Sequence, residues 1–333
     1  MRARVLSSTA LVVVLLCGAF GFSITPAQAS GSGGPDGTKW YLPLGDSLAA
    51  GAEQIGDPLS NTPDKYTSYG YTDDLWHLID NCVPTAGLND DPGNLEWNGC
   101  SKPVLYPASL SSGRGKFACL DDINGETTRS FIEPGRTTCT KYSTESQLQA
   151  AVRFLKRHRG HVGLITIDVG ADDLGLCITS DGKIKDLKKT EHGFESSCVA
   201  NKLADVKKNI KTIADGLRDA APGVKIIGGT YYNAMSVMHD VWANKWHVAE
   251  NWTPELVTFA NDKVKELNNI LIDAYRANGI KVARVDQAFH IDHHDAQVKD
   301  VCNWTRMCND FPPDVHPNGS GYLEIERAFA EQY

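Results

Sequence analysis

The segment Gly45-Asp46-Ser47-Leu48 places a serine hydroxyl directly after an apolar run at residues 40–44, which predicts a short buried strand. In open α/β sheets, ligands bind outside the carboxyl ends of the strands. A serine at such a place becomes a nucleophile when a neighbouring base takes its proton. A small polar turn after a strand is common in itself, so the interpretation depends on partners elsewhere in the chain.

Three further polar segments follow expected strands, in the order Gly125-Glu126-Thr127-Thr128, Gly170-Ala171-Asp172-Asp173 and Asp314-Val315-His316-Pro317-Asn318. The strand ends of one parallel sheet face a common crevice. There, a serine and a histidine would form a nucleophile and its base. Backbone N–H groups of glycine turns would supply hydrogen bonds to an oxyanion. The four segments therefore indicate a nucleophilic serine, its base and donors for an oxyanion.

The elements that must position these residues alternate along the chain. Strands are expected at 40–44, 117–120, 162–169, 224–230 and 280–285, and helices at 69–81, 145–158, 199–221, 253–278 and after Pro317. Such alternation predicts an α/β fold whose parallel sheet is covered on both faces. Segments 82–116 and 233–252 read as long loops. With no internal repeat and no long linker, residues 39–333 are expected to form one domain.

The first residues resemble a secretory leader. Arg2 and Arg4 precede an apolar run at 5–22, and Ala27-Gln28-Ala29 offers a cleavage site. The sequence thus predicts a signal peptide at 1–29 cut after Ala29, then a flexible leader at 30–38. An uncleaved membrane anchor is the alternative. No second apolar run approaches the ~20 residues that span a bilayer.

Charge and cysteine content narrow the class further. The 333-residue chain has a net charge of −8 and no basic run, which argues against nucleic acid or an anionic membrane surface as a partner. Eight cysteines beyond the leader indicate disulfides in an oxidising compartment. Each neighbouring pair encloses one loop-like segment, so we expect Cys82–Cys100, Cys119–Cys139, Cys177–Cys198 and Cys302–Cys308. Zinc is the alternative, but no C-x2-C pair occurs.

The four ordered segments resemble the blocks of the SGNH (GDSL) hydrolase superfamily. Ser47 matches the nucleophile block, Gly125 the glycine block, residues 170–173 the third block and His316 the last. The cysteines beside the blocks resemble those of the secreted bacterial lipase-like branch. The resemblance implies a three-layer α/β/α flavodoxin-like fold with a central parallel sheet of about five strands. It also implies hydrolysis of carboxylic esters.

By this resemblance, Ser47 attacks the ester carbonyl while His316 takes its proton. The oxyanion is bound by the N–H groups of Ser47 and Gly125 and by the third-block side chain. The substrate is a small-molecule or lipid ester, and neither a metal nor an organic cofactor is required. We expect a secreted monomer.

The third block departs from the family pattern, because Asp172 stands where the family has an asparagine that donates to the oxyanion. An ionised carboxylate donates nothing, whereas a protonated one can donate. The departure predicts either activity that favours acid pH or weak activity throughout.

The last block also departs. The family places an aspartate three residues before the histidine, where this chain has Pro313, and Asp314 comes one residue later. Either Asp314 orients His316, which makes a triad, or a backbone carbonyl near Pro312 or Pro313 does so, which makes a dyad.

These departures leave two other functions open. A carbohydrate acetyl esterase would use the same groups, and a degenerate relative would bind an ester or glycan without efficient turnover. Among the other polar residues, Asp46 and Asp173 are expected to hold turns and Glu126 to lie at the surface. The cluster at 290–295 is expected to be a solvated loop, with a weak metal site as the alternative. Trp242, Trp246 and Trp252 either line a groove or pack a loop.

Overall fold

The computed structural model describes residues 39–53, 65–66, 70–79, 105–107, 125–136, 144–179, 181–247, 250–308 and 314–333. The chain divides into residues 1–30 and 31–333, and every described residue belongs to the second unit. The expected leader, the strand at 117–120 and the cysteine pairs 82–100 and 119–139 lie outside the described residues. No helix within these ranges is long and apolar enough to cross a membrane.

A five-stranded parallel sheet forms the centre of the second unit, in the order β4-β1-β5-β8-β9. The strands are β1 (Lys39–Gly45), β4 (Leu105–Pro107), β5 (Val162–Asp168), β8 (Lys225–Gly229) and β9 (Lys281–Ala283). Counted in chain order within the sheet, this is 2-1-3-4-5, the flavodoxin-like arrangement. The order reverses between β1 and β5, so the topological switch point, where such sheets bind ligands, lies beside the carboxyl end of β1. The predicted fold class is confirmed.

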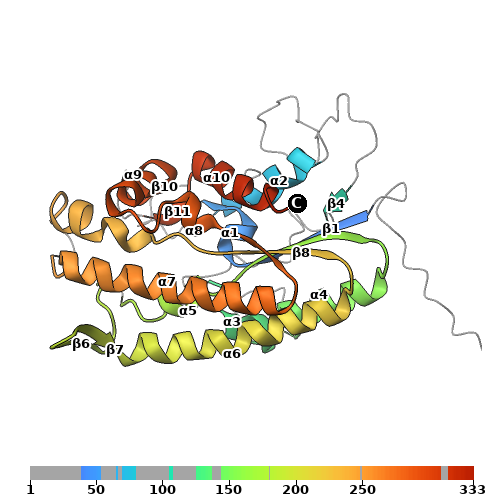
Figure 1. Ribbon diagram of the computed structural model, residues 1–333, viewed down its shortest axis with the longest axis horizontal. Coiled ribbons are helices and arrows are strands. Elements are labelled where there is room, and N and C mark those ends of the chain that lie inside the picture. The colour runs from blue at the N-terminus through green and yellow to red at the C-terminus, as the bar shows by residue number, and fades with distance from the viewer. Residues whose placement is uncertain are drawn as a thin grey trace, which may run out of the picture. The chain divides into compact units, whose positions relative to one another are not determined.

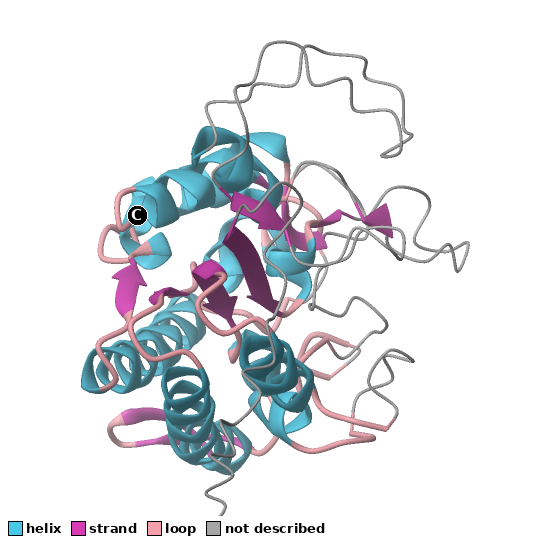
Figure 2. Cartoon of the chain, turned by 90° about the vertical axis from the view of Figure 1, so that its right-hand side faces the viewer, coloured by secondary structure: helices cyan, strands magenta, loops and turns pink. Residues whose placement is uncertain are grey.

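Helices cover both faces of the sheet, as Figures 1 and 2 show. One layer contains α3 (Thr128–Ile132), α4 (Gln147–Arg157), α6 (Ser197–Ala220) and α7 (Pro254–Ala277), and the other contains α2 (Tyr71–Ile79), α8 (Val285–Ala288), α9 (His294–Trp304) and α10 (Gly319–Ala330). Neighbouring glycines of β8 show how closely the layers pack. A Cβ on Gly228 would lie 2.4 Å from Tyr275 of α7, and one on Gly229 would lie 2.8 Å from Phe329 of α10.

The long helices begin where their capping residues predict. The Thr253 side chain accepts a hydrogen bond from Leu256 N, and Pro254 occupies the first helical position of α7. The Ser196 side chain caps α6 in the same way, by accepting from Val199 N. The buried positions of α6 include the apolar stripe that the spacing predicts, namely Leu203, Val206, Ile210, Ile213 and Leu217. These helices therefore follow from local sequence and amphipathic pattern together.

Several short elements were not expected. Strand β4 lies within the segment 82–116 that was predicted to be irregular, because three residues are too few to show a period. The expected loop at 233–252 contains a 3₁₀ helix, η5 (Ala234–Val237), and a π helix, η6 (Met238–Ala243). The remaining short elements are α1 (Ser47–Ala50), α5 (Ala171–Gly175) and the strand pairs β2–β3 (Ala52–Glu53 with Lys65–Tyr66), β6–β7 (Leu187–Thr190 with Gly193–Ser196) and β10–β11 (Thr305–Arg306 with Asp314–Pro317).

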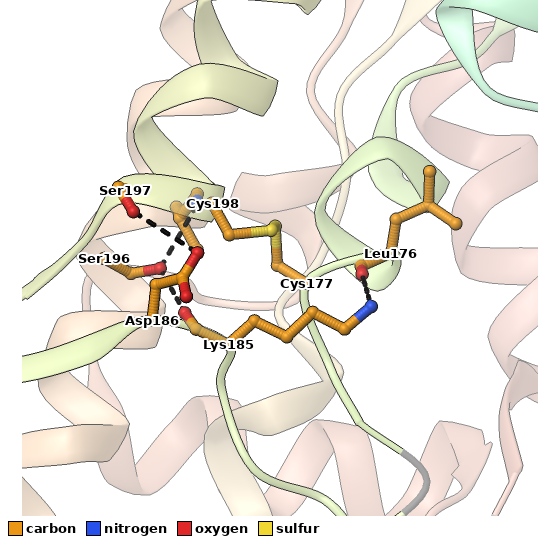
Figure 3. The surroundings of a disulfide bond; sticks show 8 residues. Leu176, Cys177, Lys185, Asp186, Ser196, Ser197 and Cys198 are labelled. Atoms are coloured by element: carbon orange, nitrogen blue, oxygen red, sulfur yellow. Dashed lines mark hydrogen bonds between the residues drawn. A yellow bond between two sulfur atoms is a disulfide. The ribbon is translucent and has the colours of Figure 1, made fainter.

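Two of the expected disulfides are present, Cys177–Cys198 and Cys302–Cys308. The first ties the chain after α5 to the first turn of α6 (Figure 3). Hydrogen bonds brace the same segment: Lys185 Nζ donates to the carbonyl of Leu176 at 2.7 Å, and Ser196 Oγ donates to the carbonyl of Lys185 at 2.7 Å. The segment between Cys177 and Cys198, which contains β6 and β7, is thus fixed where it begins and ends.

Two of the three tryptophans pack loops against the body. Trp252 is buried, and its indole donates to the carbonyl of Gly182 at 2.8 Å. The indole of Trp242 donates to the carbonyl of Met307 at 3.3 Å. The contacts of these two side chains support the prediction that they pack a loop rather than line a groove.

Candidate active site

The serine lies at the turn between β1 and α1. Asp46 caps the helix, and its Oδ1 accepts a hydrogen bond from Leu48 N at 2.9 Å. Leu48, Ala49 and Ala50 are buried, whereas Ser47 is half-buried. The first helical turn therefore directs its apolar side chains into the core and leaves the serine hydroxyl within reach of solvent.

His316 meets this hydroxyl from the far end of the chain. His316 Nε2 lies 2.8 Å from Ser47 Oγ, and His316 Nδ1 lies 2.6 Å from Asp314 Oδ1. The same carboxylate oxygen accepts from the backbone N–H of His316 at 3.0 Å. Because an ionised carboxylate only accepts, Nδ1 carries the proton and Nε2 is left to accept from Ser47. The structure thus brings together three residues that the sequence placed in two distant segments.

Gly125 and Asp172 lie against each other. Gly125 has a φ of +56°, and a Cβ built on it would lie 2.2 Å from Asp172 Oδ2. Only glycine leaves room for the carboxyl group at this position. Asp172 Oδ2 is buried, and within the described part of the chain it has no hydrogen-bond partner.

The carboxyl of Asp172 favours its neutral form. Burial raises its pKa well above the usual range, and the nearby carboxyls of Asp46, Asp173 and Glu126 raise it further. A protonated carboxyl carries an O–H donor, which the ionised form lacks. The third-block side chain can therefore donate a hydrogen bond, although it is not an asparagine.

The surroundings of Asp172 are rich in buried acids. Burial raises the pKa of Asp46 to about 6, of Asp173 to about 6 and of Glu126 to about 7. Burial likewise raises the pKa of Asp168, at the end of β5, well above its usual range. When His316 is protonated, it lowers the pKa of Asp46, because a nearby positive charge favours the carboxylate.

Glu126 is buried, so the prediction that it lies at the surface is wrong. Ser130 Oγ donates to Glu126 Oε1 at 2.5 Å, and Gln147 Nε2 contacts Glu126 Oε2 at 3.3 Å. Gln147 also brackets the backbone of Gly45: its Oε1 accepts from Gly45 N at 2.8 Å and its Nε2 donates to Gly45 O at 3.0 Å. The glycine block is thereby joined to the strand that carries the serine.

Asp173 ties the third block to the second. Its two carboxylate oxygens accept from Thr128 N at 2.7 Å and from Thr128 Oγ1 at 3.0 Å. Asn209 of α6 donates to the same hydroxyl at 3.2 Å. These contacts fix the chain after Gly125 relative to Asp172, in agreement with the turn-holding role expected for Asp173.

The cluster at 290–295 lies apart from this chemistry. His290 Nδ1 contacts Asp300 Oδ2 at 2.6 Å, and Lys265 pairs with Asp292 at 2.8 Å. The residues that the structure describes include no group of three or more side chains that could hold a metal ion.

Four polar residues of the site region were not predicted from the sequence, namely Gln147, Tyr231, Tyr232 and Asn268. Gln147 lies on the buried face of α4, one helical turn before Ala150 and Ala151. Asn268 lies on the buried face of α7, one turn before Leu271 and Ile272. A polar residue on the apolar stripe of a helix must find a buried partner. That pattern is the signal that could have identified both.

Comparison with known proteins finds one family model and several solved structures that resemble this chain. The model of the GDSL-like lipase/acylhydrolase family matches residues 85–323, which is more than half of the chain and includes Gly125, Asp172 and His316 but not Ser47. The extracellular lipase of Streptomyces rimosus is 14% identical with a TM-score of 0.50, covering 88% of this chain and 100% of its own. The phospholipase A1 of Streptomyces albidoflavus is 15% identical with a TM-score of 0.48, covering 88% and 99%. No curated protein matches the sequence.

The chain belongs to the GDSL-like lipase/acylhydrolase family. Its class is accordingly that of an esterase- or lipase-type hydrolase.

Proposed function

We propose that this protein is an exported serine esterase or lipase that hydrolyses carboxylic esters through an acyl-enzyme on Ser47. One observation carries the proposal: Asp314, His316 and Ser47 form a continuous chain of contacts of 2.6 Å and 2.8 Å. A base within hydrogen-bond reach of a hydroxyl, itself oriented by a third group, is the arrangement that activates a serine.

The first half-reaction forms the acyl-enzyme. Ser47 Oγ bonds to the ester carbonyl carbon while its proton passes to His316 Nε2, and the carbonyl oxygen becomes an oxyanion. The intermediate then collapses as the carbon–oxygen bond to the alcohol breaks, and the alcohol leaves with the proton from His316. Water repeats the sequence on the acyl-enzyme, which releases the acid and restores the serine.

The oxyanion is stabilised by the N–H groups of Ser47 and Gly125 and by the carboxyl of Asp172 in its neutral form. The contact of Asp172 with Gly125 and its raised pKa support this assignment. Each oxyanion donor is typically worth ~10²–10³ in rate. A neutral Asp172 would therefore keep this contribution to the rate, which an ionised side chain would lose.

The short contact between Asp314 and His316 favours a triad over a dyad. Asp314 holds the imidazole in one tautomer and stabilises the imidazolium that forms during catalysis. Asp314 stands one residue later than the family pattern, and this position is accommodated because Asp314 Oδ1 accepts from both Nδ1 and the backbone N–H of His316.

We further propose that the protein is exported and acts as a monomer. The disulfides Cys177–Cys198 and Cys302–Cys308 suit an oxidising compartment. The leader at 1–29, cleaved after Ala29, would deliver residues 39–333 as one hydrolase domain.

Labelling of the full chain with a fluorophosphonate, followed by mass spectrometry, tests the assignment. Ser47 Oγ would displace fluoride from phosphorus, and the adduct should map to Ser47 and be absent from Ser47→Ala. Absence of label on wild-type protein would instead favour a degenerate member that only binds its ligand. A panel of p-nitrophenyl esters from acetyl to palmitoyl, with an acetylated glycan beside it, then separates esterase, lipase and carbohydrate acetyl esterase.

A further inference from the structure

Two consecutive tyrosines follow β8 and reach the two halves of the site. The hydroxyl of Tyr231 donates to Asp46 Oδ2 at 2.5 Å, next to the serine. The hydroxyl of Tyr232 donates to the carbonyl of Val315, next to the histidine. Two adjacent side chains are therefore hydrogen-bonded, one to the turn that carries Ser47 and the other to the segment that carries His316.

Both tyrosines are held firmly. Asn268 of α7 brackets the backbone of Tyr231: its Oδ1 accepts from Tyr231 N and its Nδ2 donates to Tyr231 O, each at 2.8 Å. The ring of Tyr232 stacks on Phe289 with centroids 4.4 Å apart, and Trp304 meets Phe289 edge-on at 5.1 Å. Tyr231 and Tyr232 are 3% and 8% exposed.

We propose that Tyr231 and Tyr232 are positioning residues that together set the separation of Ser47 and His316. The inference rests on the proposed function, because it assigns these tyrosines a role in the same reaction. Each acts through the backbone or carboxylate that its hydroxyl holds.

Their geometry suits this task. The hydroxyl of Tyr231 reaches Asp46 and that of Tyr232 reaches Val315, so two neighbouring side chains span two different segments. A phenol ring has only two side-chain torsions, and here the backbone and one ring are fixed by Asn268 and Phe289. The two hydroxyls therefore lie at a defined distance from each other. Misplacement of reacting groups by about 1 Å can cost ~10² in rate.

The test uses Tyr231→Phe, Tyr232→Phe and the double variant in the full chain. Each single change should lower kcat for a p-nitrophenyl ester by ~10-fold or more and leave KM within about 2-fold, because ground-state binding is not altered. The rate of fluorophosphonate labelling at Ser47 should fall in the same proportion. The double variant should lose no more than the worse single variant, because residues that act as a unit are not additive.

Tyr275→Phe is the matched control. Tyr275 is also a buried tyrosine, but its hydroxyl has no hydrogen-bond partner among the described residues. Tyr275→Phe should leave kcat and the labelling rate unchanged. Thermal unfolding of each variant shows that assays are run on folded protein. If Tyr231→Phe does not fold, Asn268→Ala replaces it, since that change frees the Tyr231 backbone and should also lower the labelling rate.

Two results would overturn the inference alone. One is a labelled wild-type protein whose tyrosine variants label as fast as it does. The other is a double variant whose loss is the product of the single losses, which would indicate two independent structural bonds. A wild-type protein that takes no label on Ser47 would overturn the proposed function, and the role of the tyrosines with it.

Discussion

The carboxyl group of Asp172 lies over the α-carbon of Gly125, so close that a Cβ on Gly125 would be 2.2 Å from Asp172 Oδ2. The two residues come from separate blocks of the sequence, yet each restricts the position that the other can occupy. In the proposed mechanism both donate to the oxyanion, so the contact between them fixes the spacing of two donors.

Gly125→Ala should therefore impair catalysis severely. The methyl group would displace Asp172, and a φ of +56° is unfavourable for alanine. We expect kcat to fall by ~10² or more, the typical effect of losing an oxyanion donor. Gly160→Ala is the control, because Gly160 has a φ of +81° but no atom within 4 Å of an added Cβ. Equal kcat values for the two variants would contradict the role of the contact.

Asp172→Asn should change the pH dependence of kcat. The wild-type side chain donates only while protonated, and its raised pKa extends that range upward from the usual acidic region. Asparagine donates at every pH. The ratio of kcat of the variant to that of the wild type should therefore rise with pH. A ratio that stays constant from about pH 5 to about pH 10 would show that Asp172 does not donate to the oxyanion.

Asp314→Ala should lower kcat by ~10³ or more, because the imidazole loses both its tautomer and its orientation. Asp300→Asn is a suitable control. Asp300 contacts His290 at the same 2.6 Å that separates Asp314 from His316, but it lies outside the site. Kinetics on a p-nitrophenyl ester measure both variants. A loss of less than about 10-fold for Asp314→Ala would favour the dyad.

The protein should be more stable at mildly acidic than at neutral pH. Asp46, Asp173 and Glu126 have pKa values of about 6, 6 and 7 in the folded chain, against 3.8, 3.8 and 4.5 as ordinary values. The folded state thus binds more protons than the unfolded state between about pH 4 and pH 7. These protons contribute their full stabilisation below that range. The stabilisation is lost as the pH rises through the pKa values of the folded state.

Urea unfolding at about pH 5 and about pH 7.5 measures this loss as a lower free energy of unfolding at the higher pH. Glu126→Gln provides the control, because glutamine cannot ionise. Its stability should fall less over the same interval. Equal pH dependence in the two proteins would mean that Glu126 is already ionised at the lower pH.

Removal of Cys177–Cys198 should destabilise the fold more than removal of Cys302–Cys308. The first joins residues 21 positions apart and the second joins residues 6 apart. A disulfide that closes a longer loop restricts the unfolded chain more, and a loop of some 15 residues is worth about 3 kcal/mol. Chemical unfolding of the double-serine variants compares the two. A larger loss for Cys302→Ser with Cys308→Ser would contradict this entropic account.

Local signals were sufficient for the layers of the fold. The stripe of α6 and the caps of α7 lie within the sequence of each helix, so they can be read without knowledge of the rest of the chain. Strand β4 could not be found in this way, because its three residues pair with β1 only through the tertiary fold. The burial of Glu126 was missed for the same reason, since its partner Gln147 lies on another element.

The sequence by itself determined the order of the blocks, the parallel α/β architecture and the pairing of the two described disulfides, because each depends on local pattern or on chain order. Only the tertiary structure decided that Asp314 contacts His316, that Asp172 faces Gly125 among buried acids, and that Tyr231 and Tyr232 join the two halves of the site. The physical reason is that hydrogen bonds and pKa shifts depend on distances of a few ångströms between segments far apart in the chain. No periodicity or spacing in the sequence encodes such distances.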